Sequence, residues 1–309
     1  MRRLAGSWRR EMGNVPITAS LLLLPALASA ASFTFVVAGL GGEPEYEKRF
    51  REQAAAIAEA AEKAAGAPGH VVVLTGDQAR RDSLRREFES FAGKVKASDS
   101  ATVVLLGHGT FDGEEYRFNV PGTDVTGSEL AELFDKLTAK QQLIVNATSA
   151  SGATIDLWKR PERVVITATK SGGERTATRF AQFWVQAVTS DGADVNKDEV
   201  VTAAEAFDYT NRQVAASFKS DVSLATEHAR IAADDTTIFT VARLGGSAVS
   251  GSPEVAALLA QRGQIEHDLD GVKERKATLS EDAYYDELEG VLVKLALLQR
   301  QIDAKQGAR

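Results

Sequence analysis

Cysteine is absent from all 309 residues of the chain. No disulfide can form, so the stability of the fold must come from its buried core, for which a chain of this length has ample material. The same absence excludes a thiol nucleophile. Any covalent catalysis would have to use a hydroxyl group, whose proton is much harder to remove than that of a thiol.

An excess of basic residues is also missing. Lysine and arginine together number 36 against 43 acidic residues, and the formal net charge is −7. A nucleic-acid-binding surface normally requires a basic patch, so no nucleic-acid partner is predicted. Hydrophobic residues at 44% and charged residues at 26% are ordinary for a globular protein.

No apolar run reaches the roughly 18 residues that a membrane span needs. The longest, residues 17–27, follows a basic stretch that contains Arg9 and Arg10 and precedes Ala28-Ser29-Ala30. A basic segment, a short apolar segment and a small-residue cleavage site are typical of a signal peptide. We therefore expect residues 1–30 to be removed after Ala30, without a stable membrane span afterwards. The mature protein would be exported, to the periplasm or the extracellular space.

Short apolar runs alternate with stretches of helical periodicity along the next two hundred residues. Runs this short, bounded by glycine or polar residues, are typical of strands buried on both faces of a parallel sheet. Alternating strands and helices predict an α/β fold with helices on both faces of the sheet. The predicted strands are residues 32–38, 70–74, 101–106, 142–145 and 163–170, and the predicted helices include 44–65 and 175–188.

Two of these strands end in residues that can carry chemistry. Residues 101–106 lead into Gly107-His108-Gly109, and residues 142–145 lead into a stretch of small and polar residues that contains Ser149. Ligands of open α/β sheets bind beyond the carboxyl ends of the strands. We therefore expect His108 and Ser149 to lie at one edge of the sheet, facing a common cleft.

The residues after these two strands resemble the caspase, legumain and gingipain group of cysteine peptidases. In that group the histidine lies in a strand-end His-Gly, and the nucleophile lies in a pattern like Ala-Cys-x-Ser-Gly. The corresponding stretch here is 148–152, so Ser149 occupies the cysteine position. The resemblance follows the order of elements from residue 32 to residue 232. It implies a three-layer α/β/α sandwich with a mainly parallel sheet over residues 31–244.

The resemblance also implies roles for three residues. His108 and Ser149 would be the catalytic pair, and the backbone N–H of Gly109 would help to hold the oxyanion. A serine normally needs a histidine base with a buried carboxylate behind it, and no acidic residue is visibly placed for that role. The favoured hypothesis is a pseudopeptidase that binds a peptide or protein without cutting it. An active endopeptidase using Ser149, and a structural or assembly protein, are the alternatives.

Residues 194–205 match the pattern of an EF-hand calcium loop, except that Glu199 stands where glycine is usual. A side chain there carries a steric cost at positive φ, so we expect only weak calcium binding. The alternative is a helix-capping box between Thr202 and Glu205 that needs no metal. The expected calcium ligands are Asp194, Asn196, Asp198, Val200, Thr202 and Glu205.

Residues 245–252 are rich in glycine and serine and predict a linker. Beyond it, residues 253–309 carry apolar residues at helical spacing in two blocks, which predicts a helical hairpin or short coiled coil. Arg262 and Gln299 interrupt its apolar seam. Two helices bury little surface alone, so the hairpin should pack against the α/β domain as a clamp or form a homodimer.

Overall fold

The computed structural model describes residues 30–65, 70–233, 239–244 and 275–306, together with short separate stretches between 258 and 272. The predicted signal peptide up to residue 29 and the predicted linker at 245–252 lie outside the described residues. Among the helices of the described part, none is long and apolar enough to cross a membrane.

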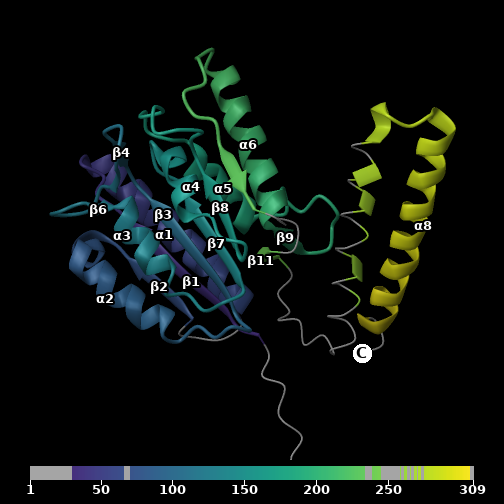
Figure 1. Ribbon diagram of the computed structural model, residues 1–309, viewed down its shortest axis with the longest axis horizontal. Helices are drawn as coiled ribbons and strands as arrows, with labels where there is room; N and C mark the ends of the chain where they lie inside the picture. The colour runs from purple at the N-terminus through teal and green to yellow at the C-terminus, as the bar shows by residue number, and fades with distance from the viewer. Residues whose placement is uncertain are drawn as a thin grey trace, which may run out of the picture.

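A six-stranded sheet organises the molecule (Figure 1). Its strand order is β10-β8-β7-β3-β1-β2, and every neighbouring pair is parallel except β10 with β8. This confirms the predicted mainly parallel sheet. The strands are β1 (Ser32–Ala38), β2 (Val71–Leu74), β3 (Ser100–Leu106), β7 (Gln141–Asn146), β8 (Arg163–Thr167) and β10 (Arg230–Ala232).

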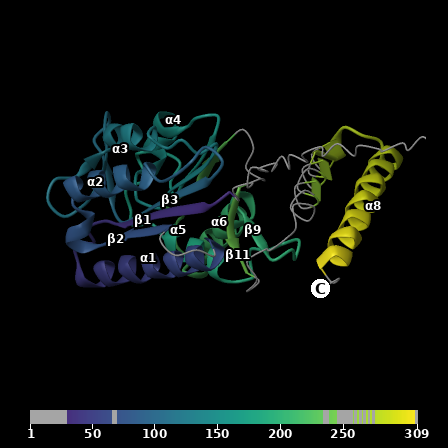
Figure 2. The ribbon, with the colours of Figure 1, turned by 90° about the horizontal axis from the view of Figure 1, so that it is seen from below.

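Helices cover both faces of the sheet, as Figure 2 shows. One face carries α2 (Arg81–Ala92), α3 (Gly127–Phe134) and α4 (Ile155–Trp158), packed around Phe88, Phe134 and Trp158. The other carries α1 (Pro44–Ala65), α5 (Phe180–Thr189) and α6 (Ala203–Ser220), packed around Phe180 and Trp184. The predicted three-layer α/β/α sandwich is therefore confirmed, and the core holds it together without disulfides.

Short elements fill the connections between the layers. The chain after β3 forms a small antiparallel sheet of three strands, β4, β5 and β6, and a second small sheet pairs β9 with β11. These elements are β4 (Gly109–Phe111), β5 (Tyr116–Phe118), β6 (Val125–Thr126), β9 (Val200–Thr202), β11 (Thr240–Arg243), and the 3-10 turns η1 (Gly76–Ala79), η2 (Ser151–Thr154) and η3 (Arg275–Ala277).

Helix α5 begins later than the sequence predicts, at Phe180 rather than at residue 175. Two hydrogen bonds fix the preceding chain outside the helix. The Thr178 hydroxyl donates to the carbonyl oxygen of Ala147 at 2.7 Å, and the Arg179 N–H donates to the Glu227 carboxylate at 2.7 Å. Tertiary contacts have thus overridden helical periodicity. The segment that they fix forms one wall of the pocket described below.

The C-terminal region is helical where it is described. Helix α8 (Glu281–Gln306) lies to one side of the sandwich, nearest the β9–β11 sheet (Figure 1). The described residues at 258, 261–262, 265, 268–269 and 271–272 are also helical. Leu298 and Ile302 of α8 are buried, whereas Leu292, Val293 and Leu297 are about half exposed.

Candidate functional site

His108 and Ser149 leave neighbouring strands at the same edge of the sheet. Strand β3 pairs with β7, with Leu105 opposite Asn146, and the two residues follow these strand ends. The expectation of adjacent strand ends is confirmed. Their side chains, however, make different contacts.

The His108 ring lies against helix α1. Its centroid is 4.9 Å from the ring of Tyr46 and 5.3 Å from that of Phe50, in edge-on arrangements. Burial lowers the pKa of His108, although a hydrogen bond with the Gly41 backbone opposes this effect. The net lowering favours the neutral imidazole.

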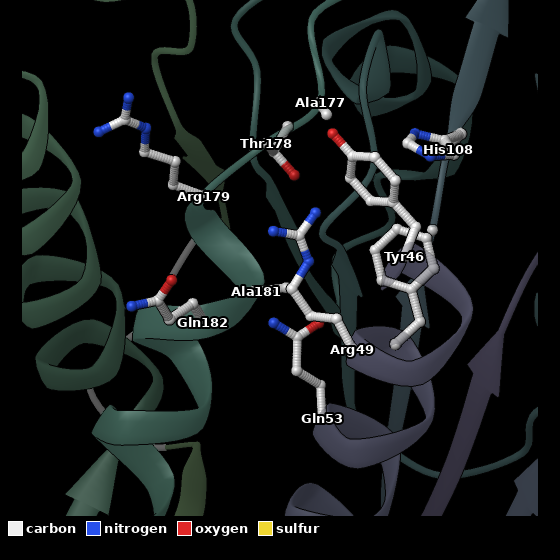
Figure 3. A pocket seen from close by; sticks show the side chains of 11 residues that line it. Tyr46, Arg49, Gln53, His108, Ala177, Thr178, Arg179, Ala181 and Gln182 are labelled. Atoms are coloured by element: carbon white, nitrogen blue, oxygen red, sulfur yellow. The ribbon is translucent and has the colours of Figure 1, made fainter. Parts of the chain in front are cut away.

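A pocket opens beside this ring, between α1 and the start of α5 (Figure 3). Its empty volume, open solvent included, is about 390 Å³. Ser149 is not among its lining residues. The pocket is lined by Tyr46, Arg49, Phe50, Gln53, Gly107, His108, Ala177, Thr178, Arg179, Ala181 and Gln182.

Arg49 supplies the positive charge that faces the pocket. Its guanidinium lies 4.3 Å from the centre of the Tyr46 ring, between Tyr46 and Thr178 (Figure 3). Arg179, by contrast, points away, because it pairs with Asp221 at 2.6 Å and stacks on Phe218. The Oε1 atom of Gln53 is buried without a hydrogen-bond partner in the described part of the protein. The pocket thus offers hydrogen-bonding groups within an aromatic wall.

Ser149 is buried, with 2% of its surface exposed. Its hydroxyl donates to the carbonyl oxygen of Gly109 and accepts from the N–H of Gly109, each at 3.1 Å. Gly109 has no room for a side chain, since an added Cβ would lie 2.5 Å from the Ser149 carbonyl oxygen. The proposed nucleophile and the proposed oxyanion donor are therefore hydrogen-bonded to each other.

The hydroxyl groups of Thr148 and Ser151, on either side of Ser149, are also buried and hydrogen-bonded. Thr148 donates to the Asn146 side chain at 2.8 Å and lies 2.6 Å from the Tyr116 hydroxyl. Burial raises the pKa of Tyr116 to about 12, so this phenol remains protonated. Ser151 contacts the Thr169 hydroxyl at 3.2 Å. These hydroxyls link the chain after β7 to β5 and to the residues that follow β8.

A carboxylate behind His108 would be expected in a serine catalytic triad. Within the described ranges, no acidic side chain forms an ion pair with His108; the histidine that does so is His228, which lies 2.5 Å from Glu174. The sequence offered no diagnostic spacing for this pair. The sequence also gave no indication that Glu227 is buried. Burial raises the pKa of Glu227 to about 7.

The backbone of the loop 194–205 turns tightly, with two residues in the left-handed region. Lys197 and Glu199 adopt positive φ of 58° and 63°, although neither is glycine. The carboxylate of Asp194, 4% exposed, accepts from the N–H groups of Asp198 and Glu199 at 3.1 and 3.0 Å. The N–H of Val200 donates to Asp198 at 2.8 Å. These bonds hold the loop in shape.

The capping box at the end of this loop is formed. The Thr202 hydroxyl accepts from the Glu205 N–H at 3.2 Å, and the Glu205 carboxylate accepts from the Thr202 N–H at 3.0 Å. Among the residues with described positions, no three His, Cys, Asp or Glu side chains converge closely enough to hold a metal ion. Calcium binding by Asp194, Asn196 and their partners therefore stays a prediction.

Comparison with protein-family models and with curated proteins gave no match. Among solved structures, protein GSU0716 from Geobacter sulfurreducens is 10% identical, covering 70% of this chain and 98% of its own, with a TM-score of 0.46. The caspase drICE is 12% identical, covering 71% and 92%, with a TM-score of 0.45. Such values do not assign the chain to a family. The class that the structure defines is a three-layer α/β sandwich with a histidine-lined pocket at its strand edge.

Proposed function

We propose that this chain is an exported pseudopeptidase, which binds a peptide or protein segment in the His108 pocket and does not cut it. The observation that carries the proposal is the reciprocal hydrogen bonding between Ser149 and Gly109. A serine that donates its proton to a backbone carbonyl is not activated by a base. The N–H that would stabilise the oxyanion is occupied by the same hydroxyl.

The pocket supports binding of a peptide more directly than it supports hydrolysis. Tyr46 and Phe50 supply apolar surface, while Arg49, Gln53 and Thr178 supply hydrogen-bonding groups. Convergent polar groups within an apolar wall are characteristic of ligand sites. The cation of Arg49 favours a peptide group that carries a carboxylate or carbonyl oxygen.

Two measurements test the proposal together. The mature protein should hydrolyse no member of a peptide library and should not react with a serine-directed fluorophosphonate probe. Binding to a displayed peptide library should nevertheless be detectable. It should weaken at least tenfold in Arg49→Gln, since a charge-assisted hydrogen bond is worth roughly 1.5–3 kcal/mol. Arg86→Gln, a change at an exposed arginine on the opposite face, is the matched control.

An active endopeptidase would give a different result. Hydrolysis by the mature protein that disappears in both Ser149→Ala and His108→Ala would establish the serine mechanism and refute the pseudopeptidase. Peptide binding that is unaffected by Arg49→Gln would place the binding site elsewhere.

A role in assembly is favoured by one separate observation. Leu292, Val293 and Leu297 on α8 are 45%, 50% and 53% exposed, which is unusual for neighbouring apolar residues on one helix. We propose that this face supports a homodimer. Molar mass by light scattering should rise with concentration in the full chain and stay monomeric after Leu292→Ser with Leu297→Ser. A concentration-independent monomer would contradict the dimer.

A further inference from the structure

The segment 170–179, which lies between β8 and α5, contacts both parts of the candidate site. Its last three residues line the pocket beside His108, as Figure 3 shows. In its middle, the carbonyl oxygen of Glu174 accepts from the N–H of Ala150 at 2.7 Å, directly after Ser149. The position of the segment 170–179 therefore affects the pocket wall and the turn that carries the serine.

Glu227 and His228, two consecutive residues ahead of β10, hold this segment in place. The Glu227 carboxylate accepts from the N–H of Arg179 at 2.7 Å. The N–H of His228 donates to the Glu174 carboxylate at 3.1 Å, and the imidazole Nδ1 lies 2.5 Å from the same carboxylate. The segment 170–179 is thus bound at two points by one short stretch of chain.

The surroundings of Glu227 favour its protonated form. Glu227 is 4% exposed, and its Oε1 atom has no hydrogen-bond partner within the described part of the chain. Charged side chains act on it from Arg179 at the start of α5, which is paired with Asp221 at 2.6 Å, and from Glu174. Burial raises the pKa of Glu227 to about 7. Ionisation above that pH places a charge where one oxygen has no donor, which is unfavourable.

The contact of His228 with Glu174 depends on pH in the same direction. Burial acts to raise the pKa of Glu174, but the hydrogen bonds from His228 and the Lys170 N–H outweigh it and hold that pKa below 4.5. Glu174 is therefore ionised near neutral pH, with the Lys170 ammonium 3.7 Å away. Histidine changes charge between about pH 5 and pH 8. A protonated His228 forms an ion pair with Glu174, whereas a neutral one forms only a weaker hydrogen bond.

We propose that Glu227 and His228 form a proton-dependent clasp, which holds the segment 170–179 at acidic pH and releases it above neutral pH. As pH rises, Glu227 must ionise while buried, and the pair of His228 with Glu174 loses its positive charge. Both contacts weaken together, so release displaces one wall of the pocket. The effect of release on peptide binding rests on the proposed function, whereas movement of the segment does not.

Spin labels can follow the clasp, because the chain has no cysteine of its own. One pair of labels joins Arg175→Cys in the segment 170–179 to Arg51→Cys on α1, both at exposed positions. The distance distribution should be narrow at pH 5.5 and should become longer and broader at pH 8. Ionisation of Glu227 alone should raise the ratio of released to held chains about tenfold or more over this range. A reference pair, Arg51→Cys with Ser90→Cys on α2, should keep the same distance at both pH values.

Variants connect the release to the two groups of the clasp. Glu227→Gln should keep the short distance at pH 8, because its amide oxygen accepts from the Arg179 N–H without ionising. His228→Gln should move the release to lower pH, because the ion pair with Glu174 is lost. Glu132→Gln, at an exposed position on α3, is the matched control and should behave like the parent.

Distances between the labels on residues 175 and 51 that are the same at pH 5.5 and pH 8 overturn the clasp. A change of unaltered size and midpoint in Glu227→Gln and in His228→Gln also overturns it, because another group would then be responsible. So does an equal change in the reference pair, which would show that the whole domain unfolds.

Peptide binding is measured separately. A peptide selected from the displayed library at pH 5.5 should bind roughly fivefold or more weakly at pH 8, and Glu227→Gln should remove most of this loss. Equal affinity at both pH values would refute control of the pocket by the clasp. If no peptide is selected at either pH, the proposed function fails, while the label distances still decide the clasp.

Discussion

Ser149 and His108 show how far a residue pattern determines a site. The sequence predicted the end of β3 at Leu106 correctly and the end of β7 one residue early, since β7 also includes Asn146. Side-chain direction past a strand end depends on the turn that follows, and no periodicity specifies it. Here Ala150 adopts a positive φ of 55°, and the preceding hydroxyl turns toward Gly109. His108 meanwhile packs on α1.

Ser149→Cys tests this geometry at a single atom. The buried thiol should react with iodoacetamide much more slowly than an exposed thiol, because burial raises a cysteine pKa and blocks access. Adding His108→Ala should leave the rate unchanged. Ser90→Cys, at an exposed position on α2, is the reference. Rapid alkylation that depends on His108 would instead show that the two residues form a catalytic pair.

Glu227 makes a pH-dependent contribution to stability. Burial raises its pKa to about 7, above the ordinary value of 4.5. Below pH 4.5 the carboxyl is protonated in both states and has no effect. Between pH 4.5 and pH 7 the Glu227 carboxyl ionises in the unfolded chain but stays protonated in the folded one. The unfolding free energy therefore falls as pH rises, by about 3 kcal/mol in total above pH 7.

Glu227→Gln should therefore stabilise the protein at pH 8 by up to about 3 kcal/mol, since the amide can still accept from the Arg179 N–H. The gain should shrink to nearly zero at pH 4. Urea unfolding at both values measures it. A gain of equal size at pH 4 and pH 8 would exclude ionisation as the cause.

Elements were predicted best where a local signal coincided with packing. Strand β1 and helix α1 have the predicted bounds, and the capping box predicted at Thr202 is formed. The late start of α5 and the β9–β11 sheet were not predicted. Both depend on partners distant in sequence, such as Glu227 for α5 and residues 240–243 for β9. Strands of three or four residues carry little periodic signal.

Glu199→Gly tests whether the positive φ at this position costs stability in the loop 194–205. An exposed side chain at φ 63° costs roughly 1–2 kcal/mol, of which the greater unfolded-state freedom of glycine cancels part. We expect a gain of up to about 1 kcal/mol in unfolding free energy and tighter calcium binding. Asp191→Gly, in the same loop region without a positive φ, should destabilise slightly. A loss of stability in Glu199→Gly would contradict the strain.

Calcium itself should raise the melting temperature only at millimolar concentration. Extracellular loops of this kind bind with dissociation constants of roughly 10⁻⁴–10⁻³ M. At a hundredfold excess over the dissociation constant, mass action contributes about 2.7 kcal/mol. An unchanged melting temperature at about 10 mM calcium would indicate that Glu205 only caps the helix and binds no metal.

The predicted signal-peptide cleavage would change the chemistry of the first residue of the sandwich. The Ala31 N–H donates to the carboxylate of Asp99 at 3.0 Å, and Asp99 is 6% exposed. If the signal peptide is removed after Ala30, this amide becomes a charged α-ammonium group in the same position. Processing would then replace an amide N–H that donates to the carboxylate by an ion pair at the start of β1, which tethers the first strand to the chain before β3.

A chain beginning at Ala31 should therefore be more stable than one beginning at Ala30, by roughly 1–3 kcal/mol near neutral pH. The Asp99 carboxylate stabilises the charged α-ammonium group of Ala31, so the pKa of that amino group rises on folding. The gain in unfolding free energy should be complete near neutral pH, below the ordinary α-amino pKa of about 8. It should be lost as pH rises through the pKa of the amino group in the folded state. Asp99→Asn should abolish the difference between the two chains. Equal stability of the two chains at pH 6, measured by urea unfolding, would show that no ion pair forms.

The intact mass of the exported protein tests the cleavage itself, because a first residue other than Ala31 would place the α-ammonium group away from Asp99.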